Sequence, residues 1–157
     1  MNEENFWSTM GHTYEDHVAV DIDDLKERLV LGKYDVGTYD EDKKSSIASR
    51  FLSEDLARKA IKASLKKKSS VIDDWMKLQY DSRLVLKINF MRQIGEGVAK
   101  GTNWNTIYPM YSVIIVLKAD CHFRSYEVVT AYPAANNAVM KQIIKDRATW
   151  YANRKKH

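Results

Sequence analysis

The spacing of apolar residues changes near the middle of this chain, from the period of a helix to the period of a strand. Before about residue 80, apolar residues recur three and four positions apart, as they do after Ser53. From Arg83 to Phe90 they alternate with polar residues instead. Helices followed by strands, without regular alternation of the two, predict an α+β fold with N-terminal helices packed on a C-terminal antiparallel sheet.

The positions of capping residues refine the expected helices. Aspartate and serine satisfy the free N–H groups at helix starts, so Asp21–Asp24 and Ser53 each predict a new helix. We interpret Ser46–Phe51 as the lead-in to the longest helical pattern and residues 32–44, which are polar, as a loop. The predicted helices therefore cover residues 6–20, residues from Asp21–Asp24 onward, residues from Ser53 onward, 71–79 and 137–153.

Three strands are expected in the second part of the chain, at 83–90, 111–118 and 126–132, with a turn near 119–125. The glycine-rich residues 95–101 predict a short strand or bulge, since they lack the Gly-Lys-Ser/Thr ending of a phosphate-binding loop. With 157 residues and 45% hydrophobic content, the chain fits a single domain.

Composition narrows the cellular setting and the chemistry. Cys121 is the only cysteine, so the fold needs no internal disulfide. We find no signal peptide and no apolar run long enough to span a membrane. No cluster of His, Asp or Glu has metal-ligand spacing, so we expect neither a metal nor any other cofactor. The oligomeric state cannot be read from these features.

Charge is divided unevenly along the chain. Residues 1–42 hold 12 acidic and 3 basic side chains, whereas residues 43–157 hold 9 acidic and 22 basic ones. A basic body suits a polyanion such as RNA. Lys66, Lys67 and Trp104 are candidate RNA-binding residues, although for Lys66–Lys68 taken alone a solvated helix end is the favoured interpretation.

Side chains able to cleave a phosphodiester occur at both ends of the chain. His17 can transfer a proton near neutral pH, and Arg28 can hold a phosphate. They are eleven residues apart, and the predicted break at Asp21–Asp24 would let them converge. Thr130 and Tyr132 lie two apart on a predicted strand and so share one face. On a continuous helix His12 would point about 140° away from His17, so one of the two would be structural.

The order and spacing of these segments resemble bacterial RNase A-like toxin domains. Such domains form the C-termini of contact-dependent growth inhibition effectors and other polymorphic toxins. The resemblance rests on Gly11-His12-Thr13, His17-Val18, Arg28-Leu29, Ser49-Arg50-Phe51, Ile94-Gly95-Glu96-Gly97-Val98 and Thr130-Ala131-Tyr132-Pro133. It covers residues 11–133 and leaves 134–157 as a C-terminal helical extension.

The resemblance implies a disulfide-free, RNase A-like fold and a metal-independent ribonuclease that acts in the cytoplasm of a target bacterium. His17, Arg28, Thr130 and Tyr132 would then be catalytic, and His12 would support the site from outside it. RNA would be the substrate, a 2′,3′-cyclic phosphate the product, and a cognate immunity protein a partner. The chain departs from the family pattern at Ala19-Val20-Asp21, where a glycine and a small hydroxyl residue are common.

Two other readings fit the same residues. A basic module that binds RNA or protein without cleaving it would need only the charge distribution. A purely structural domain could pair its acidic N-terminal segment with its basic remainder. Binding that weakens with salt would distinguish an RNA ligand from the second of these.

Overall fold

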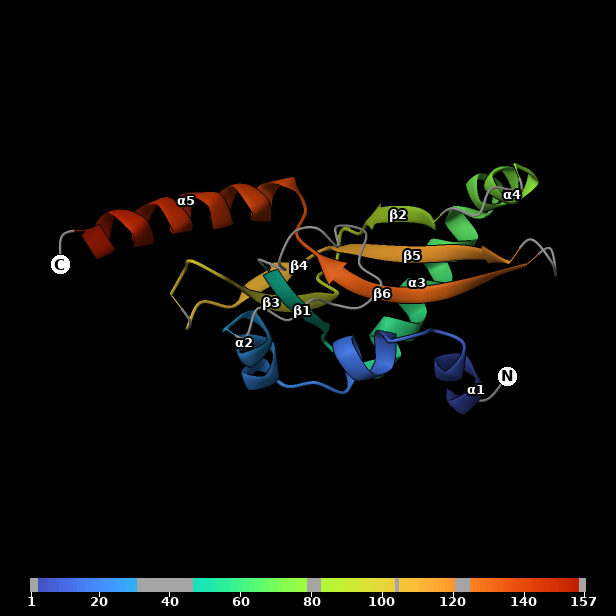
Figure 1. Cartoon of the computed structure of the whole chain (residues 1–157), viewed down its shortest axis with the longest axis horizontal. Helices are drawn as coiled ribbons and strands as arrows, with labels where there is room; N and C mark the ends of the chain where they lie inside the picture. The colour runs from blue at the N-terminus through green and yellow to red at the C-terminus, as the bar shows by residue number, and fades with distance from the viewer. Residues whose placement is uncertain (1–2, 31–46, 79–82, 104, 121–124, 156–157) are drawn as a thin grey trace.

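The computed structural model of the chain describes most of its residues (Figure 1). The described residues are 3–30, 47–78, 83–103, 105–120 and 125–155. The predicted loop at 32–44 and the candidate RNA-binding Trp104 lie outside them. Figure 1 places the N-terminus and the C-terminus at opposite ends of the molecule.

Two three-stranded antiparallel sheets form the centre of the molecule. The smaller has the order β1-β3-β4, and the larger, here called the long sheet, has the order β2-β5-β6. Their strands are β1 (Ile47–Phe51), β2 (Arg83–Asn89), β3 (Gly95–Ala99), β4 (Tyr108–Met110), β5 (Ser112–Asp120) and β6 (Ser125–Ala134). The expected α+β fold and the antiparallel pairing of the late strands are thereby confirmed.

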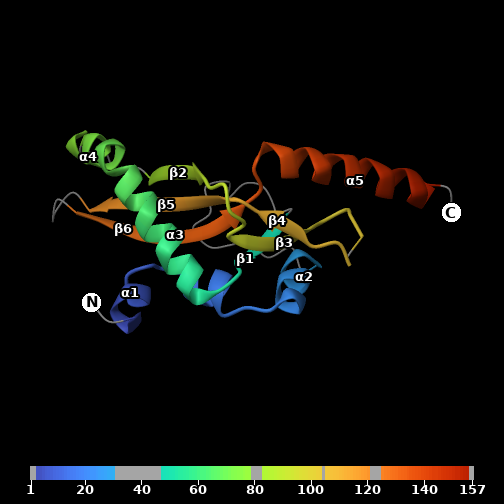
Figure 2. The same cartoon turned by 180° about the vertical axis from the view of Figure 1, so that it is seen from behind.

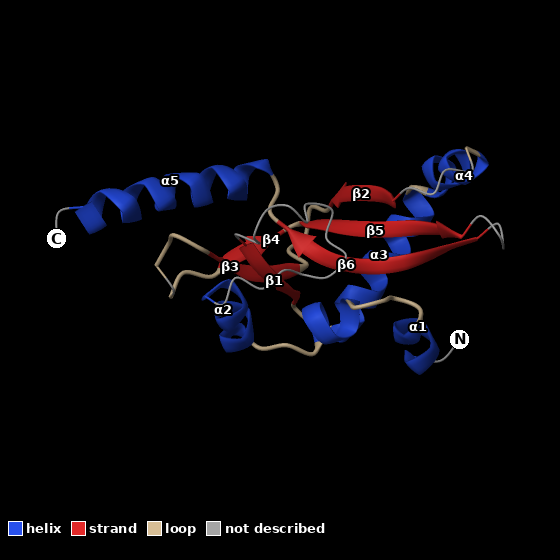
Figure 3. Ribbon diagram, viewed as in Figure 1, coloured by secondary structure: helices blue, strands red, loops and turns tan. Residues whose placement is uncertain are grey.

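Helices surround the sheets, as Figure 3 shows in blue. In chain order they are α1 (Glu3–Ser8), the π-helix η1 (Tyr14–Val18), α2 (Ile22–Val30), α3 (Glu54–Lys67), α4 (Ser69–Lys77) and α5 (Asn137–Lys155). The predicted helix starts near Asp21–Asp24 and at Ser53 are confirmed, and the Ser53 side chain accepts a hydrogen bond from the Leu56 N–H at 3.1 Å.

Helix α3 covers one face of the long sheet, as seen from behind in Figure 2. Its Ala57 and Ile61 are buried in one apolar cluster with Ile115 and Leu117 of β5. Ala131 of β6 joins the same cluster. Because successive strand residues point to opposite faces, the neighbours of these residues lie on the face away from α3.

The prediction of one helix over residues 6–20 is wrong. The chain turns at Gly11, which has φ +60°, and two short helices, α1 and η1, replace the continuous one. A side chain at this position would overlap the carbonyl oxygen of Val129, so glycine is needed for both backbone shape and close approach. The apolar spacing over 6–18 suggested a helix because it could not reveal this turn.

Residues 47–51 form strand β1 rather than a lead-in to a helix. Ile47 to Phe51 pair with Ala99 to Gly95 of β3, and Phe51 is buried. This pairing is non-local, so a local spacing rule cannot detect it. The longest helix is also not α3 but α5, at 19 residues.

The first half of α5 packs its apolar side chains on the smaller sheet. Val139 and Ile143 are buried against Tyr108 and Met110 of β4. The Tyr108 hydroxyl donates a 2.7 Å hydrogen bond to the Asp146 carboxylate. Arg147 Nε donates to the Lys100 carbonyl oxygen at 2.8 Å, and α5 then continues towards the end of the molecule opposite α4 (Figure 1).

Tyr108 should make stability fall at alkaline pH. Burial, followed by the bond to Asp146, raises the pKa of Tyr108 from 10.0 to about 12. As pH rises, this phenol therefore ionises in the unfolded chain before it does in the folded one. The stability that Tyr108 contributes is fully present below pH 10 and is lost as pH rises from 10 towards about 12. Melting temperatures of wild type and Tyr108→Phe between pH 9 and 11.5 test this: wild type should lose more stability than the variant, and parallel curves would contradict it.

Candidate functional site

His17 is a fully buried histidine whose protonation pattern is set by one backbone contact. It lies in η1 with a relative exposure of 0%, and its Nδ1 is 2.9 Å from the Ser49 carbonyl oxygen. Since a carbonyl oxygen only accepts, Nδ1 carries the hydrogen. The neutral imidazole then presents a lone pair at Nε2, the atom able to take up a proton.

Ser49 connects this contact to the late strand. Its side chain lies on β1, and the hydroxyl donates a 2.6 Å hydrogen bond to the Pro133 carbonyl oxygen. The same residue therefore holds His17 through its backbone and β6 through its side chain. Nothing in the local sequence marks this role, because it depends on β1 lying between η1 and β6.

Tyr132 is in ring contact with His17. The two ring centroids are 5.3 Å apart, with planes inclined at 30°. Tyr132 pairs with Ile114 and Thr130 with Val116, so the two side chains share the face of the long sheet opposite α3. The pairing shifts register between Val116 and Leu117, just before Thr130. Such bulges re-aim the side chains that follow them.

The Thr130 hydroxyl is buried, and no described residue forms a hydrogen bond with it. The residue is 0% exposed, and its Oγ1 makes no hydrogen bond to any residue in the described part of the chain. Burying an unpaired hydroxyl costs about 1–3 kcal/mol, whereas an apolar group of the same shape would carry no such penalty. A ligand oxygen or an ordered water at this position would recover that free energy.

Arg28 lies on helix α2 and contacts the η1 backbone. The helix begins with a reciprocal pair of bonds: the Asp24 N–H donates to Asp21 Oδ1 at 2.8 Å, and the Asp21 N–H donates to Asp24 Oδ2 at 3.2 Å. These two bonds cap the start of α2. Farther along the helix, Arg28 Nη2 donates to the Asp16 carbonyl oxygen at 3.0 Å. The arginine therefore lies beside η1, next to the residue that precedes His17, and is half-buried.

The turn at Gly11 joins η1 to the edge of β6. The His12 N–H donates to the Val129 carbonyl oxygen at 3.1 Å, and the Ala131 N–H donates to Thr13 Oγ1 at 2.8 Å. The His12 residue itself is exposed. Thr13 had no predicted role beyond its place in the Gly11-His12-Thr13 segment, although it is buried and fixes how η1 meets β6.

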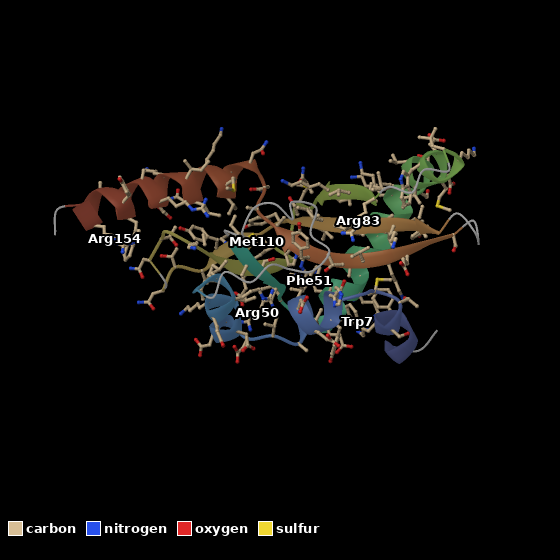
Figure 4. The ribbon with its side chains drawn as sticks, in the orientation of Figure 1. Trp7, Arg50, Phe51, Arg83, Met110 and Arg154 are labelled. Carbon is tan, nitrogen blue, oxygen red and sulfur yellow. The ribbon has the colours of Figure 1, made fainter. Side chains whose placement is uncertain are left out.

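A partly buried ion pair supports the segment between η1 and α2. Arg50 of β1 contacts Glu96 of β3 at 2.6 Å and also donates from Nη1 to the Val20 carbonyl oxygen at 3.1 Å. Figure 4 labels Arg50 on this side of β1. The adjacent cluster of Leu25, Ala48 and Val98 holds α2 on the smaller sheet. By holding Val20, the Arg50–Glu96 pair helps to fix the start of α2 and therefore the position of Arg28.

The remaining candidates lie elsewhere. Lys66 and Lys67 are exposed at the end of α3, the helix that covers the opposite face of the long sheet from Thr130 and Tyr132. No three His, Cys, Asp or Glu side chains within the described ranges are placed to hold a metal. Among the helices of those ranges, none combines the length and apolar character that crossing a membrane requires.

Comparison with known proteins gives one family and one similar structure. The family model of the bacterial CdiA-CT RNAse A domain matches residues 11–133. The chain is also similar to the crystal structure of a CdiA-CT/CdiI complex from Y. kristensenii 33638, with a TM-score of 0.65 and 20% sequence identity. That likeness covers 79% of this chain and 99% of the other, and it shows a shared fold. No curated protein matches the sequence.

Gly11→Ala should destabilise the fold strongly. A non-glycine residue at positive φ costs about 1–2 kcal/mol, and the new Cβ would also overlap the Val129 carbonyl oxygen. The matched control is Gly101→Ala, where φ is +80° but the nearest atom is Arg147 Cγ at 3.6 Å. Urea denaturation should show a larger loss in the free energy of unfolding for the Gly11 variant. Equal losses would mean that the close approach to β6 does not affect stability.

Thr130→Val should stabilise the protein by about 1–3 kcal/mol, because it removes a buried hydroxyl that lacks a partner. Thr102→Val provides the contrast, since Thr102 is equally buried but donates a 2.8 Å bond to the Ala99 carbonyl oxygen. That variant should lose stability. Both free energies of unfolding can be measured by urea denaturation, and a Thr130→Val protein less stable than wild type would refute the assignment.

Proposed function

The chain belongs to the bacterial CdiA-CT RNAse A domain family, and we propose that it is a metal-independent endoribonuclease toxin of interbacterial growth inhibition. One observation carries the chemistry. A histidine with its tautomer set by the Ser49 carbonyl lies against Tyr132, which shares a sheet face with the unsatisfied hydroxyl of Thr130. These are the groups that phosphodiester cleavage needs.

His17 would act as the general base. Its Nε2 takes the proton of a ribose 2′-hydroxyl, and that oxygen then attacks the adjacent phosphorus. The bond from phosphorus to the 5′-oxygen breaks, which leaves a 2′,3′-cyclic phosphate. The 5′-oxygen leaves with a proton, which we assign the Tyr132 hydroxyl to donate; the proton held by the adjacent His17 then restores the phenol.

Arg28 and Thr130 would stabilise charge that develops on the phosphate. A guanidinium beside η1 can donate two parallel hydrogen bonds to phosphate oxygens. The Thr130 hydroxyl would gain, from a phosphate oxygen, the partner that it lacks among the described residues. Donors that are already in place require little reorganisation during the reaction, which favours the transition state.

The substrate must also gain access to the histidine. His17 and Thr130 are both 0% exposed, so a ribose can reach Nε2 only after the surrounding segments separate. Burial has a compensating effect, since excluding water strengthens the electrostatic contacts inside the site.

The same burial favours a second candidate function, a basic module that binds RNA or protein without cleaving it. A histidine that never becomes accessible would be structural, held by Ser49 and packed on Tyr132. In that case RNA would bind and remain intact.

A protein partner follows from the family and from the similar structure, whose title names a CdiA-CT/CdiI complex. A ribonuclease toxin would harm the cell that makes it, so we propose a cognate immunity protein for this chain. Its contact surface would be acidic where it meets basic regions of the toxin. We place the toxin's action in the cytoplasm of a target bacterium.

Cleavage of total RNA by wild type and His17→Ala tests the enzyme directly. With EDTA present, wild type should degrade RNA and leave DNA intact, because DNA lacks the 2′-hydroxyl. His17→Ala should lose this activity, and His12→Ala, changed at an exposed site, should keep it. RNA that stays intact with wild type would refute the enzyme and leave the binding module.

Thr130→Val provides a second activity test that is independent of folding. The variant is expected to be at least as stable as wild type, so a drop in RNA cleavage of roughly tenfold or more would reflect the lost donor alone. Unchanged cleavage by the stable variant would remove Thr130 from the mechanism.

A further inference from the structure

Three exposed cations share a sheet face with the candidate catalytic residues. The strand register places side chains on the face of the long sheet away from α3 in three rows that cross β2, β5 and β6. The rows are Lys87–Ile114–Tyr132, Val85–Val116–Thr130 and Arg83–Lys118–Glu127. Arg83, Lys87 and Lys118 are exposed, so this face carries a track of positive charge.

Lys87 is the cation that lies in the same row as Tyr132. One strand separates them, which corresponds to about 10 Å between their backbones. Its ammonium group donates a 3.2 Å hydrogen bond to the Ala135 carbonyl oxygen, just beyond the end of β6. The charge therefore lies near the end of the strand that carries Tyr132, within reach of a phosphate beside the one that is cleaved.

Arg83 and Lys118 form a like-charge pair across neighbouring strands. They are direct register partners, and two cations in such positions destabilise a sheet. Glu127 of β6 is the register partner of Lys118 on its other side. A phosphate bound over Arg83 and Lys118 would be attracted by both cations.

We propose that Arg83, Lys87 and Lys118 bind the RNA phosphates that flank the cleaved one. The track follows β2 and β5, because Val116 and Thr130 in the middle row are buried. Contacts to phosphate oxygens would position single-stranded RNA without reading its bases. This inference rests on the proposed ribonuclease function and adds the path of the substrate.

Lys66, Lys67 and Lys68 provide a matched control. They follow one another at the end of α3, on the other side of the long sheet, and have the same total charge as the track. The sequence offered Lys66 and Lys67 of this run as RNA-binding candidates. Neutralising one set or the other therefore separates a specific surface from a general effect of net charge.

The experiment compares two triple glutamine variants of the full chain, each with His17→Ala to prevent cleavage. One replaces the three cations of the track, and the other replaces Lys66, Lys67 and Lys68. The probe is a fluorescent single-stranded oligonucleotide, whose affinity is measured by anisotropy between about 50 and 200 mM salt, a range over which phosphate contacts lose much of their affinity. Circular dichroism and thermal melts verify that both variants fold.

The track variant should bind about tenfold or more weakly than its His17→Ala parent. Each phosphate contact contributes about 0.7 to the slope of log K against log salt for single strands, so that slope should fall in magnitude by about 2. The control variant should keep most of the affinity and slope. Equal losses in the two variants, or no loss in the track variant, would overturn the proposal.

Glu127→Gln tests the same surface without removing a cation. The change removes a negative charge beside Lys118, so RNA should bind more tightly by roughly threefold to tenfold. Unchanged or weaker binding would count against the track. Failure of the ribonuclease proposal would look different, since wild type would then bind RNA along this face and leave it intact.

Discussion

The edge of β6 is hydrogen-bonded by segments from the other end of the chain, and the candidate site depends on that contact. His12, Thr13 and Ser49 all bond to backbone groups of β6 between Val129 and Pro133. An exposed strand edge would otherwise present unpaired groups. By closing this edge, the N-terminal turn brings η1, and with it His17, against Tyr132.

Gly11 makes this closure possible because no side chain fits where its backbone passes Val129. As a consequence, the site is buried before substrate arrives, and His17 and Thr130 are both inaccessible. Substrate binding and opening of the site are thus coupled in the proposed mechanism. The exposed cations of the long sheet could bind RNA first, since electrostatic attraction acts before close contact is made.

Local pattern was sufficient for several parts of the fold. Alternation over 83–90 and 126–132 identified β2 and β6, and Ser53 identified the start of α3 because capping is a local interaction. The same rules failed over 6–20 and at 46–51. A turn that packs on a distant backbone and a strand that pairs with β3 both depend on partners far along the chain.

By itself, the sequence determined the α+β class, the disulfide-free RNase A-like fold and the family, since these follow from residue types and their order. It also singled out His17, Arg28, Thr130 and Tyr132. Only the tertiary structure decided that Ser49 sets the histidine tautomer and that the Thr130 hydroxyl has no hydrogen-bond partner among the described residues. It likewise decided which lysines share a face with Tyr132, because strand register relates residues that no local spacing connects.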